Sequence, residues 1–153
     1  MKLAVRFVLV SLVILVGLAA ASFAQRNITP QIERDVQMEA DAEHNLDVAR
    51  RAFRVKKAYK EALGRFDETF AVYPDFSKMD EFYYIAGMSS YLLSQNKGKQ
   101  KVDLKSPKEK ERFAPEKLKD DAIGYLSAVV ERYPQSRFKA DAESALAEIR
   151  AAP

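Results

Sequence analysis

The chain has 153 residues, no cysteine, and 25 basic against 22 acidic side chains, for a formal net charge of +3. The absence of cysteine excludes a disulfide-stapled small fold and a zinc finger, and the few glycines and prolines exclude a collagen-like chain. An apolar content of 48% argues against a wholly disordered chain, and the length suits one domain with a modest core.

The first 24 residues have the pattern of a signal peptide. Lys2 and Arg6 precede an apolar stretch, and small side chains stand at Ser22 and Ala24, the two positions that a signal peptidase reads. We therefore expect cleavage after Ala24, so that the mature protein begins at Gln25. The alternative is an uncleaved leader that tethers the protein to a membrane, because the stretch lies at the lower limit of membrane-spanning length.

Removal of the leader lowers the formal charge from +3 to +1, because Lys2 and Arg6 leave with it and no acidic residue does. The overall basicity is then partly a property of the leader, and we expect no nucleic-acid partner. Bacterial lipoproteins carry their lipid on a cysteine that follows the leader. Because the chain has none, we expect the mature protein to be free in its compartment, which we take to be the periplasm.

Helical periodicity begins soon after the leader. Thr29 and Pro30 suit the start of a helix. The stretch from Gln31 to Tyr73 has no proline and one glycine, and its apolar phase breaks at residues 54–57. We therefore expect two helices joined at that break, with Pro74 ending the second.

Three more long helices are expected further along the chain. No segment alternates with the period of a strand, so the predicted fold class is all-α. A short helix is also expected from Ser106-Pro107 to near Phe113. The long helices are predicted at about Lys78–Ser94, at about Pro115–Arg132, and after Ser136, which we expect to cap the last one.

The two helices that end at Pro74 and Pro134 can be aligned with each other. A small residue lets two helices approach closely, a large residue one turn later fills the gap between neighbours, and the proline turns the chain back. The matched pairs are Ala62 with Ala122, Phe66 with Leu126, Thr69 with Val129, and Tyr73 with Tyr133.

This pattern resembles the second helix of the tetratricopeptide repeat. The two prolines are 60 residues apart, whereas adjacent repeats would place them about 34 apart, which indicates an insertion of roughly 26 residues near Gln95 to Pro115. The ending Tyr133-Pro134-Gln135-Ser136, followed by an alanine-rich helix, is more closely similar to periplasmic tetratricopeptide proteins of the BamD type, an outer-membrane assembly lipoprotein.

The resemblance covers about residues 42–150 and implies a short α-solenoid of helical hairpins. It departs from the BamD type in two ways, since that type has a lipidated cysteine and about five repeats, whereas this chain has two repeats and a terminal helix. In this family the first helix of each repeat lines a concave peptide-binding side. The positions that this implies are Arg51, Arg54, Tyr84, Met88 and Tyr91.

Arginines at these positions would bind carboxylates, and tyrosine and methionine would give adaptable apolar contact. The alternative is that Tyr84 and Tyr91 complete the core against a neighbouring helix.

The insertion concentrates positive charge. Residues 95–119 hold nine basic and four acidic side chains, for a local charge of +5. One interpretation is a solvated loop whose lysines keep it soluble. The others are an electrostatic contact for an acidic partner or for anionic lipid head groups, made by Lys97, Lys99 and Lys101.

The sequence offers little for catalysis. His44 is the only histidine, and a metal site with Asp41 and Asp47 would have three ligands on one helix and no fourth, so we expect a solvated polar face there. Apart from His44, the chain has no histidine that could act as the base for a serine nucleophile, and it has no cysteine. It also has no glycine-rich phosphate-binding loop. We therefore expect no enzymatic activity, no metal, no cofactor and no small-molecule substrate.

Together these features predict a non-enzymatic, exported interaction module that binds a protein or peptide of the cell envelope, with a role in outer-membrane or envelope assembly. The alternative is a membrane-tethered structural subunit that retains its apolar N-terminal helix.

Overall fold

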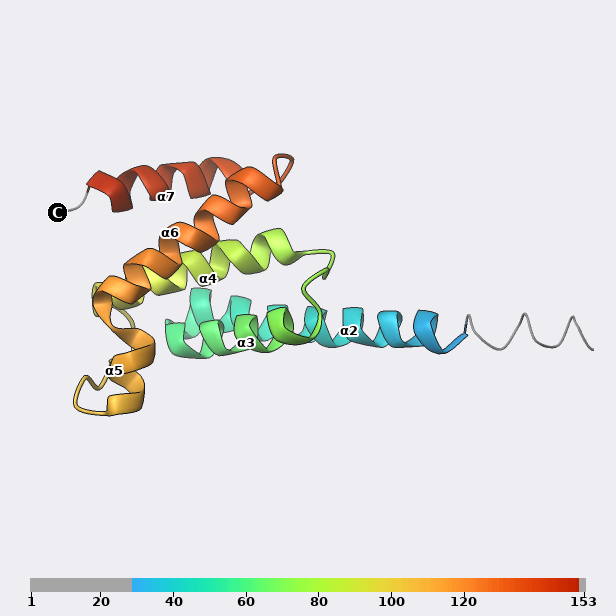
Figure 1. The fold of residues 1–153 in the computed structure, drawn as a ribbon, viewed down its shortest axis with the longest axis horizontal. Coiled ribbons are helices and arrows are strands. Elements are labelled where there is room, and N and C mark those ends of the chain that lie inside the picture. The colour runs from blue at the N-terminus through green and yellow to red at the C-terminus, as the bar shows by residue number, and fades with distance from the viewer. Residues whose placement is uncertain (1–28, 152–153) are drawn as a thin grey trace, which may run out of the picture. The chain divides into compact units, whose positions relative to one another are not determined.

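The computed structural model describes residues 29–151, and in this range it contains helices and no strand, which confirms the all-α fold class (Figure 1). The predicted leader lies outside the described residues. The helices are α2 (Thr29–Arg51), the π-helical turn η1 (Ala52–Lys56), α3 (Tyr59–Val72), α4 (Met79–Ser94), α5 (Pro107–Phe113), α6 (Pro115–Arg132) and α7 (Lys139–Ala151).

The chain divides into two compact units between Met38 and Glu39. In the first unit, the described residues 29–38 form the beginning of α2. The second unit contains everything that follows, and the rest of this description concerns it.

The predicted break between the first two helices is confirmed. The helical path continues from α2 through η1 and ends at Lys57, whose φ of 54° is left-handed. The N–H group of Ala58 donates to the carbonyl of Ala52 at 2.9 Å, which closes the last turn. The chain can then reverse into α3.

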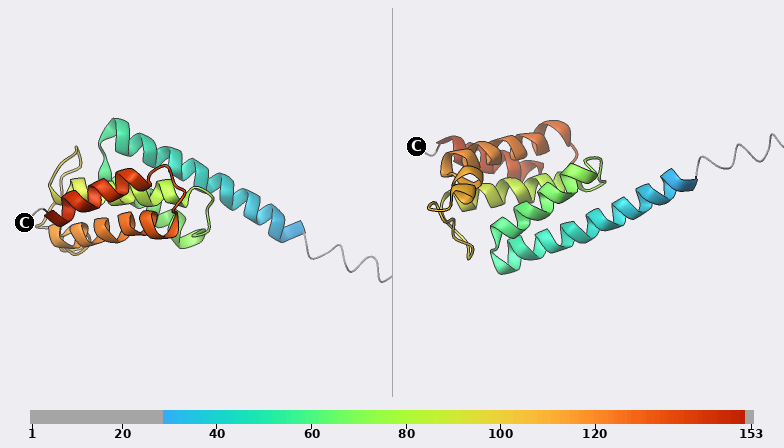
Figure 2. Two further views of the ribbon diagram at one scale, coloured as in Figure 1. Left: turned by 90° about the horizontal axis from the view of Figure 1, so that it is seen from above. Right: turned by 60° about the horizontal axis from the view of Figure 1, so that its bottom comes forward.

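The internal repeat is visible in the packing. Helix α4 packs against both α3 and α6, and α6 packs against α7 (Figure 2). Ala62 of α3 and Ala122 of α6 are both fully buried, as are the large residues one turn later, Phe66 and Leu126. The two aligned helices therefore place matched residues at matched core positions, which is the arrangement of a short stack of tetratricopeptide-like helices.

Gly87 allows α4 and α6 to approach closely. A Cβ atom at this position would lie 2.7 Å from Cγ of Leu126 and 3.3 Å from its backbone nitrogen. Any larger residue would therefore push the two helices apart.

An aromatic cluster completes the core between the repeats. The ring of Phe66 on α3 lies 5.9 Å from that of Phe82 and 5.3 Å from that of Tyr83, both on α4, and 4.8 Å from that of Tyr125 on α6. Offset and edge-on contacts at these separations are favourable. One side chain thus joins three helices.

Two residues differ from what the sequence suggested. The periodicity of α3 places Phe70 on the buried face, but its side chain is 43% exposed, and its ring stacks on the outer side of Phe66 at 5.6 Å. Ser136 does not directly precede α7, which begins at Lys139. Its hydroxyl accepts from the N–H group of Phe138 and donates to Asp80 at 2.6 Å, so it closes the turn and fastens it to α4.

The insertion is a docked segment. The N–H group of Lys99 donates to the carbonyl of Lys57 at 2.9 Å, and the N–H group of Glu61 donates to the side-chain oxygen of Gln100 at 3.1 Å. Gly98, with a φ of 91°, sits so close to Lys57 that a Cβ atom would lie 2.7 Å from the Lys57 carbonyl oxygen. The predicted short helix is present as α5.

Candidate protein-binding surface

A buried carboxylate organises one face of the helical stack. Glu81 of α4 is only 3% exposed. Arg50 of α2 donates to both of its oxygens at 2.8 Å, and Arg137, in the turn between α6 and α7, donates to one of them at 3.0 Å. The guanidinium of Arg54, on η1, lies 3.8 Å from the carboxylate. We call Arg50, Arg54 and Arg137, together with Glu81, the arginine cluster.

The charges of the cluster do not cancel. Hydrogen bonds from Arg50 hold the pKa of Glu81 below its usual value, against the opposing effect of burial, so the carboxylate is ionised at neutral pH. Arg50 is further neutralised by Asp47 at 2.6 Å. The side chains of Arg54 and Arg137 are 59% and 72% exposed, and they carry the remaining positive charge to the surface.

An aromatic pair lies beside the exposed arginines. The half-buried ring of Tyr84 stacks on Phe138 at 5.0 Å, and the guanidinium of Arg137 lies over the ring of Phe138 at 4.6 Å. Burial raises the pKa of Tyr84, and Asp141 adds to this effect while Arg54 opposes it. We call Arg54, Tyr84 and Arg137, together with the buried Phe138 that Tyr84 stacks on, the Arg54–Arg137 surface.

Two members of this surface, Arg54 and Tyr84, are among the partner-binding residues predicted from the sequence, and that role stays a prediction. Arg137 and Phe138 are not among them. Arg137 meets Glu81 across 56 residues of chain, so no local spacing could have linked them.

The other predicted site residues differ in their accessibility. Arg51 is exposed and Met88 is half-buried. Tyr91 is buried, and its hydroxyl donates to Glu148 of α7 at 2.8 Å, so it holds α4 against α7 and offers a partner little surface. The lysines Lys97, Lys99 and Lys101 are exposed on the insertion, which contacts α3.

The described residues also bear on metals and membranes. His44 is exposed, and between residues 29 and 151 no three potential ligands of the types His, Cys, Asp or Glu come together as they would around a metal ion. None of the helices in the described part of the chain has the length and apolar character needed to cross a bilayer.

Comparison with known proteins identifies a family. Curated proteins and solved structures gave no match. A family model described as "YfiO: Outer membrane lipoprotein" matches residues 22–152, which is most of the chain, and this confirms the predicted resemblance to BamD-type repeat proteins. The sequence itself contains no cysteine, unlike a lipoprotein of the usual kind. The chain belongs to the YfiO outer membrane lipoprotein family.

Proposed function

We propose that the protein is a non-enzymatic adaptor of the cell envelope that binds a partner protein, in outer-membrane assembly, through the Arg54–Arg137 surface. The observation that carries this proposal is the pair of exposed arginines, Arg54 and Arg137, which lie beside a stacked aromatic pair. Both arginines form ion pairs with the buried carboxylate of Glu81. Membership of an outer membrane lipoprotein family supports the envelope as its place of action.

The surface fits a partner segment that presents a carboxylate next to an apolar side chain. A guanidinium binds a carboxylate with two parallel hydrogen bonds. Arg137 is already held by Glu81 and by the ring of Phe138, so little side-chain freedom is lost when a partner binds. Tyr84 adds apolar contact area with few rotatable bonds.

Two further parts of this proposal concern the rest of the chain. The leader directs export, and it is removed after Ala24 so that the protein acts in the periplasm. The lysines Lys97, Lys99 and Lys101 of the insertion give a second, electrostatic contact, with an acidic partner or with anionic head groups at a membrane surface.

The test is capture of envelope proteins on immobilised protein, compared between two variants of equal charge. We expect Arg54→Ala/Arg137→Ala to weaken binding of the captured partner at least tenfold, because the variant loses both guanidinium groups that would bind the partner's carboxylates. The control Arg65→Ala/Arg150→Ala removes the same charge from α3 and α7 and should bind as the wild type does. Affinity is then measured with the purified partner at low and at physiological salt.

Helicity by circular dichroism must be unchanged in both variants, since Arg50 still pairs with Glu81. Equal binding by the wild type and by both variants would overturn the assignment of the surface. Absence of any captured partner at low salt would overturn the adaptor function.

A further inference from the structure

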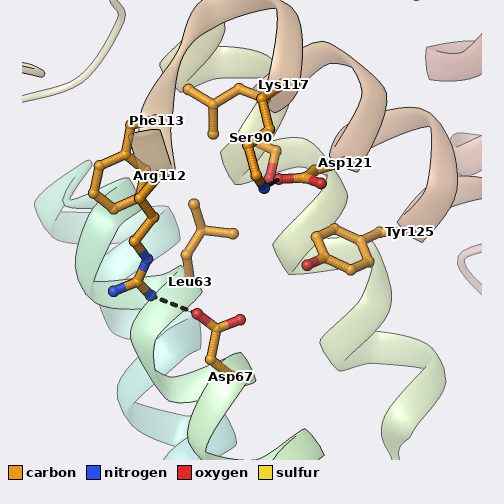
Figure 3. Close-up of a pocket in the computed structure, with 9 residues that line it drawn as sticks. Leu63, Asp67, Ser90, Arg112, Phe113, Lys117, Asp121 and Tyr125 are labelled. Carbon is orange, nitrogen blue, oxygen red and sulfur yellow. Dashed lines mark hydrogen bonds and ion pairs between the residues drawn. The ribbon is translucent and has the colours of Figure 1, made fainter. Parts of the chain in front are cut away.

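A small cavity lies on a different part of the molecule, where α3, α4, α5 and α6 meet (Figure 3). Its volume is about 80 Å³. Leu63 and Phe113 stand toward one side of it and Tyr125 toward the other. The polar side chains of its lining are Asp67, Ser90, Arg112, Lys117, Asp121 and Tyr125.

Ser90 supplies an unpartnered hydroxyl to this cavity. The residue is 1% exposed, and its Oγ atom has no hydrogen-bond partner. On the same helix, the hydroxyl of Ser94 donates to the carbonyl of Tyr91 at 2.7 Å, so a serine of α4 can satisfy itself locally. A buried hydroxyl without a partner is costly, and native structures rarely leave one. The neighbouring Ser89 is buried and unpartnered in the same way but does not line the cavity, so what distinguishes Ser90 is its place in the cavity wall.

The charged lining residues come as two opposite pairs. Arg112 pairs with Asp67, and Lys117 pairs with Asp121 at 2.7 Å. All four side chains are partly exposed, and ion pairs of this kind contribute little to stability, so either pair can rearrange around a ligand at low cost. The net charge of the lining is zero, but a ligand can meet both cationic and anionic side chains there.

Tyr125 adds a hydroxyl that stays protonated. Burial, with the nearby carboxylates of Asp121 and Asp67, raises its pKa to about 12. The hydroxyl is therefore available both as a donor and as an acceptor at neutral pH.

We propose that this cavity binds a small zwitterion, the head group of a small α-amino acid such as alanine. One cation, Arg112 or Lys117, takes the ligand carboxylate, one aspartate, Asp67 or Asp121, takes its ammonium group, and Ser90 gains its missing hydrogen bond. A ligand of a single charge would satisfy one kind of lining group and repel the other.

The size of the cavity limits the ligand. Each enclosed water needs about 10–15 Å³, so the volume corresponds to on the order of six non-hydrogen atoms. The head groups of alanine and glycine fit this volume.

The proposal also gives the insertion a structural purpose. Arg112 and Phe113 are at the end of α5, the short helix of the insertion, and ordinary repeats have no equivalent segment. The insertion therefore builds one wall of the cavity. This inference does not depend on the Arg54–Arg137 surface, which shares no residue with the cavity.

The test is a titration of the isotope-labelled protein followed by two-dimensional NMR of its backbone amides. Alanine and glycine are the zwitterionic probes, and propionate and ethylamine carry one charge each at the same ionic strength. We expect saturable shifts at Ser90 and Tyr125 with alanine and glycine, and at least tenfold weaker binding of each single-charge probe.

Variants assign the site. Ser90→Ala and Tyr125→Phe should each weaken alanine binding about three- to tenfold, and melting curves check that both variants remain folded. The control Ser144→Ala changes an exposed serine of α7 and should bind as the wild type does. The proposal is overturned by equal binding of propionate or ethylamine, by undiminished binding to both site variants, or by the absence of any saturable shift.

Discussion

Glu81 shows how a single buried side chain can join distant parts of a chain. Its carboxylate accepts hydrogen bonds from Arg50 on α2 and from Arg137 beyond α6, and it sits on α4 between them. Removing one partner from a buried ion pair costs more than the pair contributes, because the remaining charge loses its compensation. The residue is therefore a sensitive point for measuring stability.

We expect Glu81→Gln to lower the free energy of unfolding by about 1.5–3 kcal/mol, the range for a hydrogen bond to a charged group. Urea denaturation measures this loss. The matched control is Asp47→Asn, which removes an exposed partner of Arg50 and should cost less than about 1 kcal/mol. Equal costs for the two variants would show that burial of Glu81 is unimportant.

The same variant has a defined pH dependence. Because the pKa of Glu81 is lowered from 4.5, its contribution to stability is complete above that pH and is lost as the pH falls through the lower folded-state value. The difference in stability between the wild type and Glu81→Gln should therefore shrink below about pH 4.5. A constant difference down to pH 3 would contradict the lowered pKa.

At this scale the sequence suggests residues by their place in a known repeat and not by their partners. Arg54 and Tyr84 follow from such positions, although Glu81 and Phe138, which they contact, lie far along the chain, and their role in binding stays a prediction. Arg137 and Ser90 could not be found in this way, because one meets its partner and the other reaches a cavity wall only through the tertiary fold.

At the scale of elements, the contact between α4 and α6 depends on Gly87. The position lacks a side chain, and the space is filled by Leu126 from the neighbouring helix. Glycine is otherwise unfavourable within a helix, so its presence here is explained by the close approach of the helices.

We expect Gly87→Ala to lower the free energy of unfolding by about 1–2 kcal/mol, because overpacking outweighs the gain in helix propensity. Gly124→Ala on α6 is the matched control, since a Cβ atom there meets nothing within 4 Å. The control should raise stability by up to about 1 kcal/mol. Thermal melts of both variants check the prediction, and a stabilising effect at Gly87 would refute the close packing.

Helix boundaries were predictable because the residues that end helices act locally. Pro74 and Pro134 lie just past the ends of α3 and α6, and the loop after α4 takes positive φ at Asn96 and Gly98. The exposure of Phe70 shows the limit of periodicity, which indicates which residues share a helix face but not how far the neighbouring helix extends to cover them.

At the scale of the whole molecule, the predicted export of the protein rests on residues 1–24, which lie outside the described part of the chain. We expect protein recovered from the envelope of cells that express the full chain to begin at Gln25, because the residues before it match a signal peptidase site. Intact-mass measurement with N-terminal sequencing tests this. A start at Met1 would instead favour the tethered subunit.

The net charge of the insertion does not determine whether its backbone is free or bound to the rest of the protein. Its excess of lysine was equally compatible with a free loop and with a binding segment. The structure shows that its backbone is bound: Lys60 donates to the carbonyl of Lys101 at 2.7 Å and to the carboxylate of Glu109 at 2.7 Å. The backbone carbonyl of Lys57, the side chain of Lys60 and the backbone N–H group of Glu61 hold it, and composition alone does not reveal such contacts.

The docking of the insertion on the start of α3 has a consequence for protein engineering. Residues 95–114 do not form a portable module, because the carbonyl of Lys57, the amine of Lys60 and the amide of Glu61 complete their hydrogen bonding. A chimera that receives this segment must also receive residues 57–61 as its cradle. The two stretches should therefore be transplanted together, although some 40 residues of chain separate them.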